Sequence, residues 1–285
     1  MRIVNLIENT EGQPGCAFEH GLSFYIETSK HKALMDLGQT DNSIKNAQAL
    51  GIDLKAVDTV VLSHGHYDHS GGIMPFSAIN DHAPIYMQQG AFGEYYADDG
   101  KKSEGPCYRY IGIDKEIAKL PQIRPITGDY RIDDELELFT IKNRTHPLPF
   151  TNKRLLIKMG DGFIPDNFEH EHFLVINESG KKVLMSGCAH NGILSILDAY
   201  KEKYGSFPDV VISGFHLMLK REYRENELEE IRAIAEELKG YPTMFFTCHC
   251  TGEAAFEEMK KIMGDKLEYV SSGETIINSD YGFLT

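Results

Sequence analysis

The stretch Ser63-His64-Gly65-His66-Tyr67-Asp68-His69-Ser70-Gly71-Gly72 places four potential metal ligands within six consecutive residues. It follows a strongly apolar run that predicts a buried β-strand. Side chains two residues apart in an extended segment point to the same side, so His64 and His66 can chelate one ion. Asp68 and His69 come next, where the chain turns, and can reach a second ion. Imidazoles together with a carboxylate suit zinc, iron or manganese.

Three later segments repeat this arrangement of an apolar run, a Ser or Thr, and then a His. The runs at residues 183–186, 210–213 and 244–247 lead to His190, His216 and His249. Helices predicted at residues 191–204 and 226–239 separate these runs, which indicates parallel strands whose carboxyl ends share one edge of a sheet. We therefore expect His190 and His249 to complete the metal site. His216 is either a ligand, a partner of a ligand or a substrate-facing acid, and we favour the last two.

The motif H-x-H-x-D-H followed by Gly-Gly resembles that of the metallo-β-lactamase superfamily. Residues 32–38, which end in Asp36-Leu37-Gly38, are similar to a strand of that superfamily. Residues 19–27, 187–193, 214–217 and 249–252 are similar to the branch that contains the 7,8-dihydropterin-6-methyl-4-(β-D-ribofuranosyl)aminobenzene-5'-phosphate synthases. The resemblance implies an α/β fold, a four-layer αβ/βα sandwich of two mixed β-sheets flanked by helices. It also implies a single domain over residues 1–285, with pseudo-duplicated halves and a lid or insertion around residues 90–125.

The chain departs from the general superfamily pattern at one ligand position. Cys188 stands where many members have a bridging Asp, and it is either a thiolate ligand or a buried packing residue. The general pattern also has a His shortly before this point, where His170 and His172 flank Glu171 and His146 lies farther upstream. Whether the site holds one ion or two is therefore open.

Other residues are assigned supporting or ordinary roles. Asp36 is expected to accept a hydrogen bond from a ligand imidazole rather than to bind metal, and Glu171 is placed with it outside the ligand set. Cys248 and Cys250 should point away from His249 in an extended chain. The remaining histidines, without clustered partners, are interpreted as loop residues; they are His20, His31 and His82.

Composition limits the class of partner. The net charge is −14, which disfavours polyanionic nucleic acids and anionic membrane surfaces. Five cysteines without a secretion signal favour free thiols in a reducing cytoplasm. The two least regular segments, residues 90–125 and 143–168, are expected to be loops, and the first is interpreted either as a lid or as a surface insertion.

These observations predict a metal-dependent hydrolase or transferase that acts on a small phosphate-containing substrate and carries one or two divalent ions. Zinc is preferred, with manganese, magnesium or iron as alternatives. Bound water would reach a pKa of about 7, and Asp68 or His216 would manage the proton. The resemblance implies instead transfer of a pterin-methyl group with release of diphosphate. The alternatives are a di-iron redox or oxygen-binding protein, a metal-binding module without catalysis, and a nuclease; a homo-oligomer is open.

Overall fold

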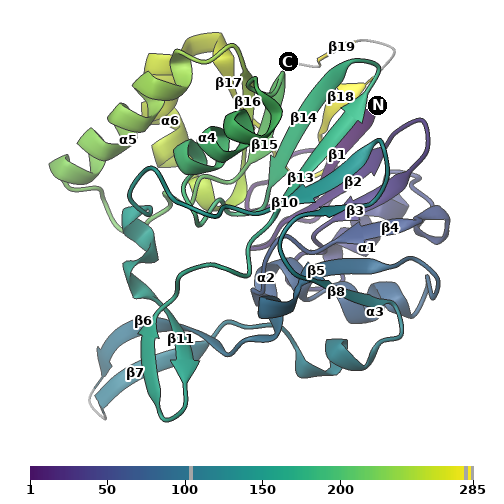
Figure 1. Cartoon of the computed structure of the whole chain (residues 1–285), viewed down its shortest axis with the longest axis horizontal. Coiled ribbons are helices and arrows are strands. Elements are labelled where there is room, and N and C mark those ends of the chain that lie inside the picture. The colour runs from purple at the N-terminus through teal and green to yellow at the C-terminus, as the bar shows by residue number, and fades with distance from the viewer. Residues whose placement is uncertain (103–104, 279–281, 284–285) are drawn as a thin grey trace.

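The computed structural model describes residues 1–102, 105–278 and 282–283, and it contains two large β-sheets packed face to face with helices outside them (Figure 1). The predicted αβ/βα sandwich is confirmed. The first sheet has the order β19-β18-β1-β2-β3-β4-β5-β8. Its strands are β1 (Arg2–Ile7), β2 (Ser23–Glu27), β3 (Lys32–Met35), β4 (Thr59–Val61), β5 (Ile85–Gln88), β8 (Ile123–Ile126), β18 (Thr275–Asn278) and β19 (Gly282–Phe283).

The second sheet has the order β17-β16-β15-β14-β13-β10-β9. Its strands are β9 (Tyr130–Arg131), β10 (Leu136–Phe139), β13 (Phe173–Glu178), β14 (Lys181–Ser186), β15 (Val210–Ser213), β16 (Met244–Thr247) and β17 (Leu267–Tyr269). Strands β14, β15 and β16 are parallel, and their last residues Ser186, Ser213 and Thr247 lie side by side. This register brings the loops that follow the three strands to one edge, as the alternation of strands and helices predicts.

Three apolar clusters separate the layers. One fills the space between the sheets and joins Phe24 and Val61 of the first sheet to Met185 and Ile212 of the second. A second cluster lies between the second sheet and its helices, which Figure 1 shows grouped on one face. A third packs the first sheet against its own helices. The helices are α1 (Asn42–Ala49), α2 (Tyr67–Ser70), α3 (Ile73–Ser77), α4 (Ile193–Tyr204), α5 (Glu225–Lys239) and α6 (Glu253–Met263).

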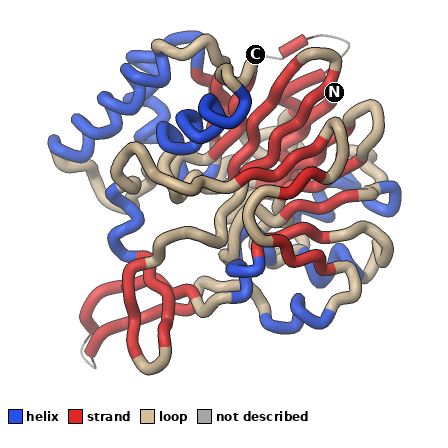
Figure 2. Tube along the Cα trace, in the orientation of Figure 1, coloured by secondary structure: helices blue, strands red, loops and turns tan. Residues whose placement is uncertain are grey.

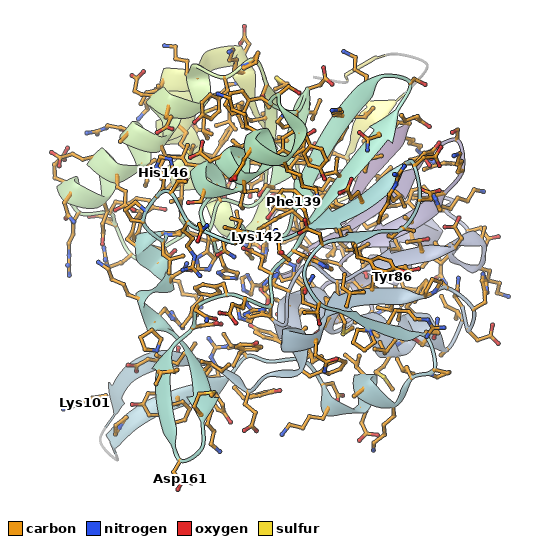
Figure 3. All side chains as sticks on the ribbon, in the orientation of Figure 1. Tyr86, Lys101, Phe139, Lys142, His146 and Asp161 are labelled. Carbon is orange, nitrogen blue, oxygen red and sulfur yellow. The ribbon has the colours of Figure 1, made fainter. Side chains whose placement is uncertain are left out.

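A four-stranded antiparallel sheet, here called the arm, projects from the sandwich (Figure 2). It consists of β6 (Tyr95–Lys102), β7 (Gly105–Tyr110), β11 (Leu155–Met159) and β12 (Gly162–Pro165), in the order β12-β11-β6-β7. Lys101 and Asp161 lie at the far ends of its two hairpins (Figure 3). The expectation that residues 90–125 and 143–168 are loops is wrong, because each segment contributes a hairpin and the two hairpins pair through β6 and β11.

Other predicted elements match the structure to within a few residues. In the described part of the chain, no helix combines the length and the apolar composition that a membrane crossing requires.

Candidate metal centre

Three histidine side chains from two distant parts of the chain meet beyond the ends of β4 and β14. His64 and His66 follow β4, and His190 follows β14. Their ligand nitrogens all lie within 4.8 Å of one another, and the Nε2 atoms of His64 and His190 are 3.3 Å apart. Two nitrogens bound tetrahedrally to one zinc ion would be separated by about 3.4 Å. The spacing of these donors therefore fits one ion.

Hydrogen bonds on the far side of two of these rings select the nitrogen that can bind metal. Ser63 Oγ lies 2.7 Å from Asp36 Oδ2, to which it donates, and so accepts from Nδ1 of His64 at 2.9 Å. Nδ1 of His190 donates to Oδ1 of Asn152 at 3.1 Å. With Nδ1 protonated in both rings, each Nε2 keeps its lone pair for a ligand.

A second group of donors surrounds the carboxylate of Asp68. Its Oδ2 atom lies 3.3 Å from Nε2 of His20, 3.5 Å from Nε2 of His249 and 3.9 Å from Nε2 of His69. His69 donates from Nδ1 to Asp36 at 2.6 Å, and His249 donates from Nδ1 to Asn9 at 2.9 Å. These rings also present Nε2 towards the centre, so the site has enough donors for two ions.

Two buried nitrogens test whether the residues fit a metal. Among the described residues, Nε2 of His66 and Nε2 of His249 have no hydrogen-bond partner. Burying a polar atom without a partner is costly, and such atoms are rare in folded proteins. Burial lowers the pKa of His66 to about 3, an effect that the neighbouring His170 reinforces. A neutral imidazole with an unpaired nitrogen is what a divalent metal requires, so the donor set fits one.

The backbone around the site is held in an uncommon conformation. Four non-glycine residues here have positive φ angles: Asp36 (59°), Ala189 (53°), His216 (49°) and His249 (50°). Such conformations cost energy and persist where the surroundings determine them, which is common at functional sites. The strain lies in the loops that present the candidate ligands.

Cys188 belongs to a potential donor group with His64 and His69. Its Sγ atom is 3.2 Å from Nε2 of His69, and burial raises the pKa of the thiol well above its ordinary value. Cys250 also contributes to a potential donor group, with Cys188 and His249. Cys248 differs, because it packs into the apolar cluster between the sheets.

The two histidines just before β13 have hydrogen-bond partners at both ring nitrogens, although His170 also belongs to a potential donor group with His66 and Asp166. His170 donates from Nε2 to Asp166 at 3.0 Å and accepts from the Gly65 amide at Nδ1. His172 donates from Nε2 to the carbonyl of Leu62 and lies 3.2 Å from the amide of Gln88 at Nδ1. His146 is at the surface beside Asp198. Both buried rings thus hold the loop that carries the ligands.

Glu171 supports the loop that carries His190, and His216 faces the cleft. The Glu171 carboxylate accepts from the backbone amides of His190 and Asn191, at 2.7 and 2.9 Å, and so fixes the loop that presents His190. The Thr151 hydroxyl donates to the His216 carbonyl and lies 2.7 Å from Nδ1 of the His216 ring. The hydroxyl therefore accepts from this nitrogen, and Nε2 of His216 is left unprotonated.

A cleft with a volume of about 910 Å³ opens above the centre. Arg109 and Arg154 line one wall, where Asp99 pairs with both. Lys220 and Arg221 line another part of the cleft. The lining combines these four cations with the carboxylates of Asp68, Asp98 and Asp99. Three of the cations are already in ion pairs, which leaves Lys220 as the cation of the lining without an ion pair among the described residues and the one most available to an anionic ligand.

Several site residues lie outside the sequence-predicted set. The prediction that His20 is an ordinary loop residue is wrong, because it contacts Asp68 and stacks on His249 with ring centroids 5.1 Å apart. Asn9, Thr151 and Asn152, which fix three of the rings, were not predicted either. Single polar residues in loops have no spacing pattern that reveals such contacts. His20 stands beside a glycine in a segment used for the family resemblance, which was the one available signal.

Known proteins resemble this chain over most of its length. The family model described as "Metallo-beta-lactamase superfamily" matches residues 17–237. An uncharacterized protein of Methanocaldococcus jannaschii is 28% identical over 90% of this chain and 93% of its own length. The 7,8-dihydropterin-6-methyl-4-(beta-D-ribofuranosyl)-aminobenzene-5'-phosphate synthase of the same organism is also 28% identical, over 90% of each chain.

A solved structure agrees over the whole chain. Tm1679, titled a metal-dependent hydrolase of the beta-lactamase superfamily, superposes with a TM-score of 0.80 at 29% identity and covers 98% of this chain and 100% of its own. The resemblance inferred from the histidine motif is confirmed: the chain belongs to the metallo-beta-lactamase superfamily.

Proposed function

We propose that the protein is a metal-dependent enzyme that acts on a small phosphate-containing substrate. The observation that carries the proposal is the placement of unpaired histidine nitrogens below a cleft lined by four cationic side chains. The nitrogens account for a metal, and the cations account for a substrate with anionic oxygens. The cleft is large enough for a small organic phosphate, and the cations are too few to form a stripe along a nucleic acid.

The protein's own groups divide the work. His64, His66 and His190 would hold one ion, and Asp68 with His249 would hold a second. Such ions supply a Lewis acid and an activated water molecule for attack at phosphorus. Arg109, Arg154 and Lys220 would orient the phosphate, as cationic side chains do at phosphate sites.

His216 would handle the proton. Its ring lies 4.2 Å from the ring of His190, between centroids, and lines the cleft. Burial lowers the pKa of His216 to about 3, with His66 reinforcing the effect, so the ring is neutral at rest. Because the Thr151 hydroxyl accepts from Nδ1, Nε2 would accept a hydrogen bond from the reacting group. With its pKa lowered to about 3, the ring would orient that group's proton rather than remove it at neutral pH.

A second candidate reaction is transfer of a pterin-methyl group with release of diphosphate. The 28% identity to a protein named as a pterin-related synthase favours it. Several cations along the cleft would also accommodate a substrate with more than one phosphate. In this reaction the same residues bind the diphosphate leaving group, and an aryl partner takes the place of water.

A screen of small phosphomonoesters, phosphodiesters and diphosphates tests the proposal. We expect release of orthophosphate or diphosphate by the metal-loaded protein and loss of this activity in His66→Ala. Equal turnover by the wild type and His66→Ala would show that another site, or a contaminant, is responsible. Diphosphate release that depends on an added aryl amine would identify transfer rather than hydrolysis.

Metal analysis separates the remaining alternatives. Bound zinc or manganese supports this proposal, whereas two iron ions with visible absorbance that changes on reduction would favour a redox or oxygen-binding protein. Stoichiometric metal without turnover on any phosphate would favour a binding module.

A further inference from the structure

His20 occupies a defined place beside the group around Asp68. Its Nε2 atom is 3.3 Å from Oδ2 of Asp68, and its ring stacks on that of His249. Nitrogen and oxygen donors of one tetrahedral zinc ion are separated by about 3.4 Å. The distances from Asp68 to His20 and to His249, 3.3 and 3.5 Å, both fit this value.

The backbone on both sides of His20 is fixed. Glu19 accepts hydrogen bonds from the amides of Gln39 and Thr40, and its own amide donates to the carbonyl of Glu8. On the other side, the Leu22 amide donates to the carbonyl of Asp68 at 3.1 Å. Leu22, two residues after His20, is thus hydrogen-bonded to the backbone of Asp68, and the His20 ring faces the Asp68 side chain. This backbone contact fixes the position of His20 although its side chain is 44% exposed.

Gly21 shows how tightly the two segments pack. A Cβ atom built on Gly21 would lie 2.9 Å from the carbonyl oxygen of Asp68 and 2.7 Å from the amide of Gln39. Any other residue would therefore push the loop, and His20 with it, away from Asp68. The chain uses a glycine here to bring the imidazole within ligand distance of the carboxylate.

The same loop also fixes His249. The carboxylate of Glu8 accepts from the His249 amide at 2.9 Å, and Asn9 accepts from Nδ1 of the ring and donates to the His249 carbonyl. Nε2 of His249, which lies 3.5 Å from the same Oδ2 of Asp68, is buried and has no hydrogen-bond partner among the described residues. The loop between β1 and β2, residues 8–22, therefore orients the donor His249 and itself carries the donor His20.

We propose that His20 is a metal ligand that binds the second ion together with Asp68 and His249. The inference rests on the proposed metal-dependent function and adds a ligand to it. His69 Nε2, at 3.9 Å from Asp68, is the fourth donor within reach. His20 is the most exposed of these donors and lines the cleft.

Titration of the metal-free protein with Co²⁺ tests this inference, with affinity measured by competition against a chelator and ligand geometry by the visible absorption spectrum. The variants are His20→Ala and, as a matched control, His82→Ala, which removes an exposed histidine in the turn after α3. We expect two equivalents in the wild type and the control. In His20→Ala the first equivalent should persist, which shows that the variant is folded. The second equivalent should bind more than ~10-fold more weakly, because losing even a hydrogen-bond partner of a ligand lowers metal affinity by that factor. The absorption bands of the second cobalt ion should also change.

Chemical rescue separates a ligand from a hydrogen-bond donor. Imidazole and 1-methylimidazole can both coordinate a metal, but 1-methylimidazole has no N–H to donate to Asp68. We expect both to restore the affinity and the spectrum of His20→Ala. Rescue by imidazole alone, or by neither, would overturn the proposal and leave His20 a positioning residue.

The remaining outcomes distinguish this inference from the proposed function. Unchanged binding of both equivalents in His20→Ala, or a single equivalent in the wild type, would overturn the role of His20 and leave the metal-dependent function standing. A wild type that binds no cobalt would instead refute the metal-dependent function itself.

Discussion

Individual hydrogen bonds decide which imidazole nitrogens face the centre. Asp36 is the most connected of the partners: it accepts from the Ser63 amide, from the Ser63 hydroxyl and from Nδ1 of His69. Through the Ser63 hydroxyl it also fixes the tautomer of His64. One buried carboxylate therefore orients a candidate ligand of each ion, which is the arrangement commonly found behind metal-bound histidines.

Asp36→Asn should weaken metal binding without removing a ligand. An amide at this position would present an N–H to at least one of the groups that now donate to Asp36, so His69 or Ser63 would lose its partner. We expect metal affinity to fall by ~10–100-fold, measured by chelator competition. Asp81→Asn, at an exposed position, is the control and should bind as the wild type does. Unchanged affinity in Asp36→Asn would mean that the ligands are oriented without it.

Lys220 gives a prediction about the substrate. It lines the cleft and has no ion pair among the described residues, whereas Arg221 is paired with Glu227. A hydrogen bond to a charged group contributes about 1.5–3 kcal/mol, so Lys220→Ala should raise KM for a phosphate substrate by ~10-fold or more. Steady-state kinetics on the best substrate from the phosphate screen measures this, with Lys45→Ala as a remote control. A KM equal to that of the wild type would place the phosphate elsewhere.

At the scale of elements, close backbone packing fixes the position of the short helix α2, which carries Asp68 and His69. Gly71 ends this helix, and a Cβ atom built there would lie 1.9 Å from the carbonyl oxygen of Gln39. The Gly71 amide donates to the carbonyl of Gly38 at 2.8 Å. The loop after β3 and the end of α2 are therefore in direct contact, and no side chain fits between them.

Gly71→Ala should destabilise the protein strongly. Its φ angle of −61° suits any residue, so the effect would come from the collision alone. We expect a loss of at least about 3 kcal/mol, the upper end of ordinary overpacking, measured by urea unfolding. Gly162→Ala is the control, because a Cβ atom built there has one neighbour within 4 Å, at 3.9 Å. Equal stability of the two variants would show that the loop after β3 moves to accommodate the extra methyl group at little cost in free energy.

The elements also show what the sequence could and could not predict. His190 and His249 were placed at the centre because parallel strands end at one edge, and the structure brings both there. The arm was missed because the paired residues of its central strands β6 and β11 are about sixty positions apart in the sequence, and neither strand alternates clearly. His20 was missed because its position depends on how Gly21 packs against Asp68, a tertiary contact without a local pattern.

At the scale of the whole molecule, a histidine joins the two large sheets at their rim. His31 precedes β3 of the first sheet and contacts Asp58 through Nδ1 at 2.8 Å and Asp133, before β10 of the second sheet, through Nε2 at 2.9 Å. His31 lies in a loop, as the sequence predicts, but the expectation that it lacks clustered partners is wrong. Burial would lower its pKa, but the hydrogen bonds to the two carboxylates outweigh burial and raise the pKa above 6.5.

This raised pKa predicts how stability depends on pH. A group whose pKa is higher in the folded state stabilises the fold fully below its unfolded pKa of 6.5, and this contribution is lost as the pH rises through the folded value. The destabilisation caused by His31→Gln should therefore be larger at about pH 6 than at about pH 9. Urea unfolding of the two proteins at both pH values measures it, with His82→Gln as control. If the stability difference between the wild type and His31→Gln were the same at both pH values, the contacts of His31 with Asp58 and Asp133 would not depend on its charge.

The arrangement of the two sheets matters because it assembles one centre from both: His64 and His66 come from the first sheet, and His190 and His249 come from the second. The most direct test is a crystal structure of the zinc-loaded protein with anomalous diffraction at the zinc edge. The predicted result is an anomalous peak about 2.1 Å from Nε2 of His64, His66 and His190. A zinc-soaked crystal without a peak there, or with zinc bound only elsewhere on the molecule, would contradict the account.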